Sequence, residues 1–214
     1  MAAGGRALFG PVDLCWPRGT SVALMGPSGS GKSSALRTLA GLQAPQSGSV
    51  HLAGVEVYAL SEDARDAFRL SKVGYIPQDL ALVPEMTVAE NVGLPLLFTG
   101  TARREREDRV GELLDQLGIA HRAGALVGRV SGGEAQRCAI ARALVTRPMI
   151  VLADEPSAAL DATNAAWAAD LLTATATQGA CCVIATHDDQ VARECERHVD
   201  LLGWRRATAS ALAP

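Results

Sequence analysis

A glycine-rich octapeptide at residues 26–33 has the residue types and the spacing that bind nucleotide phosphates. It reads GPSGSGKS, fits the pattern GxxxxGK[ST], and lies between an apolar run and a helix-forming stretch, residues 34–42. Glycines let successive backbone N–H groups converge on phosphate oxygens at a helix N-terminus, whose dipole favours anions. Lys32 can reach the β- and γ-phosphates, and the Ser33 hydroxyl can ligate the Mg²⁺ that bridges them. A glycine-rich turn with a solvated lysine is the alternative. The residues expected to bind ATP are Gly26, Pro27, Ser28, Gly29, Ser30, Gly31, Lys32, Ser33 and Ser34.

Two adjacent carboxylates, Asp154 and Glu155, end the apolar run MIVLADE. Because side chains alternate along an extended chain, the two acids need not point the same way. Asp154 is suited to hold Mg²⁺, directly or through water, and Glu155 is suited to polarise an attacking water. An acidic pair that only starts a turn before Pro156 is the alternative. Many unrelated nucleotide hydrolases share a phosphate loop, so a further element is needed to distinguish among them.

That further element is the segment VSGGE at residues 130–134. Ser131, Gly132 and Gly133 stand at the start of an expected helix, where a hydroxyl and exposed N–H groups make a second anion site. Two phosphate-type sites in a chain of this size indicate one ATP gripped from both sides. A capped helix start without a ligand is the alternative interpretation.

Short apolar runs that alternate with helix-period segments must position these residues. The pattern predicts an α/β fold with a mainly parallel sheet and helices on its faces. Most of the runs are apolar at every position, as strands covered on both faces should be. The expected strands are residues 21–25, 73–76, 149–153, 181–186 and 199–202.

Helical periodicity is clearest in residues 105–117, where Val110, Leu113, Leu114 and Leu117 form one apolar stripe opposite a charged face. A second helix is expected after the glycines of the VSGGE segment, and a third over residues 162–176, with its buried side supplied by Trp167, Leu171 and Leu172.

Between Asp79 and Arg129 the strand pattern stops, and Pro84, Pro95 and Gly100 are expected breaks. The sequence therefore predicts a single domain over residues 1–214. Its catalytic lobe comprises about 1–78 and 141–214, and an inserted helical lobe comprises about 79–140.

Composition and charge exclude several classes of protein. The 214 residues, 48% of them apolar, suit one globular domain, and the net charge of −3 argues against a nucleic-acid partner. No apolar run reaches the roughly 18 residues that a membrane-spanning helix needs. The start of the sequence has no basic leader and no continuous apolar core, and the five cysteines follow no zinc or disulfide spacing, so a reducing cytoplasm is expected. Cys181 and Cys182 are expected in the core.

Taken together, the motifs resemble the ABC ATPase family over nearly the whole chain and in the family's order. They are GPSGSGKS, GYIPQ ending in Gln78, VSGGE, LADEP, SAALD ending in Asp161, and ATHD containing His187. The resemblance implies a P-loop NTPase (RecA-like) core and a transport-coupled ATPase. It also implies that two nucleotide-binding subunits, expected to be a homodimer, pack head to tail, so that Ser131, Gly132, Gly133 and Glu134 of one copy close over the ATP of the other.

The same resemblance assigns roles and partners. Gln78 joins Ser33 and Asp154 at the Mg²⁺, Glu155 is the general base, Asp161 communicates across the dimer, and His187 contacts the γ-phosphate. Taken singly, Gln78 and His187 are typical surface or core residues. The expected partners are separate transmembrane permease subunits, which place the chain in the cytoplasm, peripheral on the inner face of the membrane.

The stretches ENVGLPLLFTG and ARALVTRP are similar to a subgroup with lipoprotein-releasing, macrolide-exporting and cell-division ATPases, so export or extraction from the membrane is expected. An ATP-dependent switch subunit with little or no transport is the alternative, and a soluble P-loop kinase or a DNA-repair ATPase is disfavoured by VSGGE.

The sequence departs from the family pattern at two places. Val130 and Glu134 stand where the family usually has Leu and Gln, which bears on dimer closure while leaving the Ser-Gly-Gly contact. Where the family carries an aromatic that stacks on adenine, the sequence has residues 2–5, AAGG, and Phe9 is the nearest ring. Phe9 is interpreted as a core residue, with adenine stacking as its alternative.

Overall fold

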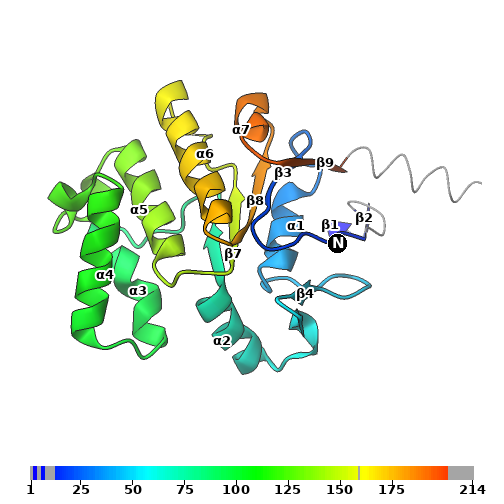
Figure 1. Ribbon diagram of the computed structural model, residues 1–214, viewed down its shortest axis with the longest axis horizontal. Helices are drawn as coiled ribbons and strands as arrows, with labels where there is room; N and C mark the ends of the chain where they lie inside the picture. Colours follow the sequence, from blue (N-terminus) through cyan, green and yellow to red (C-terminus); the bar gives the residue numbers. More distant parts are fainter. Residues whose placement is uncertain (1, 4–5, 8–12, 159, 202–214) are drawn as a thin grey trace, which may run out of the picture.

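A five-stranded parallel sheet lies at the centre of the chain, as seen in a computed structural model that describes residues 2–3, 6–7, 13–158 and 160–201 (Figure 1). The strand order is β6-β7-β8-β3-β9, and each neighbouring pair is parallel. The strands are β3 (Ser21–Met25), β6 (Val73–Ile76), β7 (Ile150–Asp154), β8 (Cys181–Thr186) and β9 (Arg197–Asp200).

The predicted strands are confirmed, with shifts at two of them. β3, β6 and β8 have the expected bounds, and β7 is shifted by one residue. β9 begins at Arg197 rather than at residue 199 because pairing with β3, which joins Val22 to Arg197, sets its register at the sheet edge. The end expected for it, residue 202, lies outside the described residues.

The two faces of the sheet carry different helices because successive side chains of a strand point to opposite faces. Val22 and Leu24 of β3 pack with α1 (Lys32–Leu39) and α2 (Glu62–Lys72), and Ala23 packs with the helices of the other face. Those helices are α5 (Gly132–Leu144), α6 (Ala162–Thr177) and α7 (Asp189–Arg193). α1 starts two residues before the expected stretch and stops at Leu39, ahead of the left-handed Gly41.

A cluster of helices forms the end of the molecule away from α1 (Figure 1). It consists of α3 (Val88–Phe98), α4 (Arg103–Gln116), the 3₁₀ turns η2 (Ala120–Arg122) and η3 (Val127–Arg129), and the start of α5. The stripe predicted for α4 is confirmed, since Val110, Leu114 and Leu117 are buried. The expected lobe boundary at residue 140 falls inside α5, so one helix serves both lobes, and the division of the chain into lobes stays a prediction.

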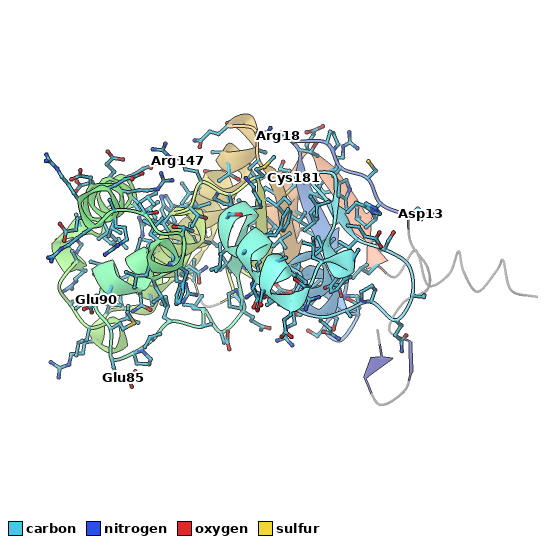
Figure 2. The ribbon with its side chains drawn as sticks, turned by 90° about the horizontal axis from the view of Figure 1, so that it is seen from below. Asp13, Arg18, Glu85, Glu90, Arg147 and Cys181 are labelled. Carbon is cyan, nitrogen blue, oxygen red and sulfur yellow. The ribbon has the colours of Figure 1, made fainter. Side chains whose placement is uncertain are left out.

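The expected break at Pro95 is wrong, because Pro95 lies inside α3. A proline in a helix interior costs about 3 kcal/mol. Burial of Val92 and Leu96 offsets that cost, as does a capping box at the start of the helix between Thr87 and Glu90, whose side chain is labelled in Figure 2. Gly100 does end the segment, with a φ of 71°.

Smaller elements complete the described chain. They are the hairpin β1 (Ala2–Ala3) with β2 (Arg6–Ala7), the hairpin β4 (His51–Leu52) with β5 (Val55–Glu56), and η1 (Val57–Ala59). All five cysteines are free, and Cys182 is fully buried, as expected of a core residue, with Cys181 half-buried. None of the helices within the described ranges combines the length and the apolar character needed to cross a bilayer.

Candidate functional site

The glycine-rich segment after β3 forms an open turn that leads directly into α1. Gly26, Gly29 and Gly31 have φ values of 153°, 77° and 103°, which side chains rarely tolerate. A Cβ on Gly26 would lie 2.6 Å from Ser30 Oγ, a buried hydroxyl without a hydrogen-bond partner among the described residues. Within the same ranges, no side chain caps the start of α1. The loop thus leaves N–H groups and a hydroxyl available to an anion, and it suits a phosphate chain.

Lys32 is held inside this loop rather than extended into solvent. Its ammonium donates to the Gly26 carbonyl at 2.7 Å and to the Pro27 carbonyl at 3.4 Å. It also forms an ion pair with Glu155 Oε1 at 3.1 Å, with both side chains almost entirely buried. The solvated-lysine alternative is therefore wrong for this conformation. A bound phosphate would have to draw Lys32 away from the Glu155 carboxylate.

Glu155 occupies a strained position between two partners. Its φ of 48° is left-handed, and its N–H donates to the Ala185 carbonyl of β8 at 2.8 Å, which fixes the turn directly after β7. While Oε1 faces Lys32, Oε2 lies 2.9 Å from Nδ1 of His187, a ring that is 62% exposed. The sharp turn also directs the Glu155 carboxylate away from that of Asp154.

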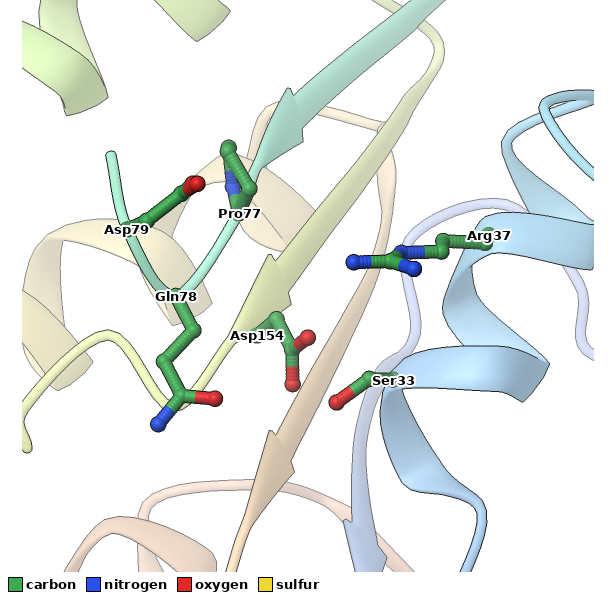
Figure 3. A pocket seen from close by; sticks show the side chains of 6 residues that line it. All are labelled: Ser33, Arg37, Pro77, Gln78, Asp79 and Asp154. Atoms are coloured by element: carbon green, nitrogen blue, oxygen red, sulfur yellow. The ribbon is translucent and has the colours of Figure 1, made fainter. Parts of the chain in front are cut away.

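Asp154 faces a different space, a cavity of about 460 Å³ lined by Ser33, Arg37, Pro77, Gln78, Asp79 and Asp154. Figure 3 shows the Ser33 hydroxyl, the Asp154 carboxylate and the Gln78 amide turned toward this common space. Burial raises the pKa of Asp154, and a hydrogen bond with Ser33 acts in the opposite direction. Asp154 Oδ1 is buried without a hydrogen-bond partner among the described residues.

An oxygen-only set of this kind fits Mg²⁺, which takes one or two carboxylates, a hydroxyl and phosphate oxygens. The unpaired Asp154 Oδ1 gives the ion a ligand that the protein itself does not use. No group of three or more His, Cys, Asp or Glu side chains in the described part of the chain could hold a metal on its own. A cation here would therefore need further ligands, such as water or phosphate oxygens.

The VSGGE segment lies at the start of α5, in the helical cluster away from α1 (Figure 1). Ser131 caps the helix, accepting from the Glu134 N–H at 3.3 Å, and the Glu134 carboxylate accepts from the Ser131 N–H at 2.8 Å and from its hydroxyl at 2.9 Å. The capped helix start is therefore confirmed, and the second anion site stays a prediction. Hydrogen bonds from Arg122 first, and then from Ser131, lower the pKa of Glu134 to about 2.

Asp161 caps the next helix, α6, where its carboxylate accepts from the Asn164 N–H at 2.9 Å and from the Asn164 amide. Arg137 of α5 donates to Asn164 Oδ1 at 3.3 Å and lies 3.8 Å from the Trp167 ring centroid. The starts of α5 and α6 are thereby joined through side chains.

The structure brings the phosphate loop, residues 26–34, to the carboxyl edge of the sheet together with Asp154, Glu155, His187 and Gln78, and it leaves the other predicted residues apart. Lys32, Glu155 and His187 form one contact group, and Ser33, Asp154 and Gln78 line the adjoining cavity. Ser131 to Glu134 and Asp161 lie on helix starts outside that cavity lining.

Sequence reasoning missed two charged residues of these sites. Arg37 lines the cavity, and its position one helical turn after Ser33 is a signal that could have found it. Arg122 pairs with Glu134 across a loop, and no local pattern indicates such a pair. Phe9 lies outside the described residues, so its interpretation as a core residue, with adenine stacking as the alternative, stays a prediction.

Comparison with known proteins gives these sites a context. The family model described as ABC transporter matches residues 9–158. The lipoprotein-releasing system ATP-binding protein LolD 2 of Caulobacter vibrioides is 46% identical, over 93% of this chain and 88% of its own. LolD of Gluconobacter oxydans is 42% identical, over 86% and 80%. The uncharacterized ABC transporter ATP-binding protein YbbA of Escherichia coli K12 is 41% identical, over 89% and 84%.

A solved structure agrees with the fold. The ATP-binding cassette MJ0796, in a dimeric post-hydrolysis state bound to ADP and Pi, matches with a TM-score of 0.84 and 36% identity, over 90% of this chain and 85% of its own. The parallel sheet, the phosphate loop and the helical cluster therefore belong to a known architecture.

Proposed function

The chain belongs to the ABC transporter family as an ATP-binding subunit that hydrolyses ATP, and we propose that it drives the release of lipoproteins from a membrane. The observation that carries the site assignment is the placement of Lys32, Glu155 and His187 in one contact group beside the Ser33 and Asp154 cavity. The proposed cargo rests on the LolD relatives, whose names describe a lipoprotein-releasing system.

In the proposed mechanism, backbone N–H groups of residues 26–34 and the Lys32 ammonium bind the phosphates of ATP. Ser33, Asp154 and Gln78 would hold Mg²⁺, which would neutralise charge on the phosphates of ATP. Glu155 accepts a proton from the water that attacks the γ-phosphorus, the bond from that phosphorus to the β–γ bridging oxygen breaks, and ADP and phosphate are the products. His187 orients the Glu155 carboxylate through the 2.9 Å contact and faces the γ-phosphate.

The second half of the proposed site comes from another copy of the chain. Family members dimerise, and MJ0796 is dimeric in its solved structure. We assign Ser131, Gly132 and Gly133 to the γ-phosphate held by the opposite copy, with Glu134 as the carboxylate that caps the same helix start, and Asp161 to contact across that interface. Support comes from the position of these residues outside the cavity where Ser33 and Asp154 lie.

ABC ATPase subunits work with transmembrane subunits. For this chain we propose separate permease subunits as partners, and a position on the inner face of the cell membrane. ATP-driven closure of two copies would push on the permease helices, and hydrolysis would reset them.

The test is a reconstitution with the permease that co-purifies with the chain. Proteoliposomes containing the complex and a lipidated protein are given ATP and Mg²⁺, and lipoprotein released into the aqueous phase is measured. We expect release that needs ATP and is lost with Glu155→Gln. Hydrolysis and assembly without release of any cargo would refute the proposed transport and favour a switch subunit.

A further inference from the structure

The start of α5 carries an internal anion at the place proposed for the phosphate of another copy. Glu134 Oε2 accepts from the N–H and from the hydroxyl of Ser131, the same groups that would donate to a phosphate. Because a helix N-terminus attracts negative charge, the carboxylate is a favourable cap for the isolated chain. It is also a negative charge beside the proposed docking position of a polyanion.

Arg122 supplies the opposite charge. Its Nε donates to Glu134 Oε1 at 2.7 Å, so the carboxylate has one oxygen on Ser131 and the other on Arg122. The Glu134 side chain is 17% exposed and that of Arg122 is 47% exposed, which leaves the guanidinium reachable from outside the chain. Nε2 of His121 lies 3.5 Å from Glu134 Oε1.

The loop that carries Arg122 is fixed in place. Ile119 is 1% exposed and packs in the core, and the Arg122 N–H donates to the Ile119 carbonyl at 2.9 Å. Arg137 holds the preceding backbone through a 2.8 Å hydrogen bond to the Leu117 carbonyl. Arg122 is therefore presented on a preorganised turn, which reduces the entropy lost when its charge is used.

We propose that Arg122 is a positioning residue for ATP-driven dimerisation: it neutralises Glu134 and lets the start of α5 accept the nucleotide held by the opposite copy. The inference rests on the proposed head-to-tail dimer and adds a residue outside the motifs of the family. The expected effect follows from the net charge at the start of α5. With both residues present the pair is neutral, with Arg122 alone the site is positive, and with Glu134 alone it is negative toward the incoming phosphates.

A purely structural role for the pair gives a different expectation. If Arg122 only anchors the loop to α5, Arg122→Ala and Glu134→Gln both remove the same ion pair and should act in the same direction, with no relief when they are combined. The electrostatic role makes them act in opposite directions, and it makes the double variant resemble the parent.

The test uses the full chain carrying Glu155→Gln, which traps ATP, with dimer formation followed by light scattering during an ATP titration with Mg²⁺. We expect Arg122→Ala to raise the ATP concentration for half-maximal dimer by about tenfold, since one added charge opposes a polyanion near the surface. Glu134→Gln should dimerise at least as readily as the parent, and the double variant should return to parental values. The Arg122→Ala effect should shrink as salt is raised.

Two controls separate the causes. Arg103→Ala breaks another exposed ion pair, in which Arg103 Nε lies 2.7 Å from Glu107 Oε1 on α4, and it should leave dimerisation unchanged. ATP affinity measured below the dimerisation range should be the same for Arg122→Ala and the parent, since Lys32 of the same copy binds that nucleotide. Parental dimerisation by Arg122→Ala, or no rescue by Glu134→Gln, overturns the role of Arg122 alone. Failure of the Glu155→Gln parent to dimerise at any ATP concentration overturns the head-to-tail proposal, and this inference with it.

Discussion

Replacing Glu155 with Gln tests the contact group at the centre of the site. In the chain without nucleotide the change leaves the Lys32 ammonium, which is 6% exposed, without its carboxylate at 3.1 Å. Removing one partner of a buried ion pair costs about 3–5 kcal/mol. Because Lys32 keeps its hydrogen bonds to the Gly26 and Pro27 carbonyls, we expect a smaller loss of unfolding free energy, about 1–3 kcal/mol.

Bound phosphates would restore a partner to Lys32, so ATP should stabilise this variant more than it stabilises the parent. Turnover should fall by at least about 100-fold, the usual contribution of a general base. Unfolding is followed by thermal denaturation in dilute protein with and without nucleotide, and turnover by phosphate release. Glu194→Gln, an exposed carboxylate on the same half of the chain, is the matched control and should behave as the parent.

Two results would refute this reasoning separately. Parental turnover by the Glu155→Gln variant would show that another group activates the water. Unchanged stability without nucleotide, together with a parental increase on adding ATP, would show that the Lys32–Glu155 pair does not compete with phosphate.

Four other predictions follow from the geometry. His187→Ala removes the partner of the base and should lower turnover, measured by phosphate release, by roughly 100-fold, so parental turnover would contradict the role given to His187. Asp154→Asn should make ATP affinity insensitive to EDTA. If the ATP affinity of this variant still depended on Mg²⁺, the ion would have to bind at other residues. The pKa of Glu134 is lowered from 4.5 to about 2, so its contribution to stability is present above pH 4.5 and is lost as the pH falls toward 2. Between pH 4.5 and 2 the urea midpoint of unfolding should therefore fall less for Glu134→Gln than for the parent. Gly74→Ala would place a Cβ 2.3 Å from a carbonyl oxygen of α5 and should lower the free energy of unfolding by about 1–3 kcal/mol. The control Gly111→Ala, at a position with open space around it, should raise that free energy by up to about 1 kcal/mol, and urea denaturation measures both.

The parts of the site that are local in sequence could be predicted from the sequence. The phosphate loop spans residues 26–33, and its function depends on glycine conformations and a helix start that those residues dictate themselves. Apolar runs likewise located β3 and β8, since strands buried on both faces need no partner sequence to be recognised. In the helical cluster the apolar stripe located α4, whereas Pro95 concealed α3. Outside the cluster, α2 was not predicted, and it buries none of its residues fully.

The contacts that decide how the site works were beyond prediction because they join distant segments. Glu155 was expected as the general base, with no partner predicted for it, and the structure pairs it with both Lys32 and His187. Arg122 and Glu134 meet because Ile119 anchors one loop in the core, which neither residue encodes alone. Secondary-structure propensities apply to single segments of the sequence. Which charged side chains contact each other is decided only when those segments pack together.

The arrangement links hydrolysis to two separate events under the proposed function. Glu155 is engaged by Lys32 until phosphate takes that ammonium, so the base becomes free only after nucleotide has entered. The remaining donors, at the start of α5, lie outside the cavity of the same copy and carry their own carboxylate cap. A single copy therefore meets only the first condition. α5 is joined to α6 through the hydrogen bond from Arg137 to Asn164, and in the turn before α6 the Ala158 N–H donates to the Glu155 carbonyl at 3.1 Å. Binding of the opposite copy's nucleotide at the start of α5 would therefore be transmitted through these contacts to the backbone of Glu155.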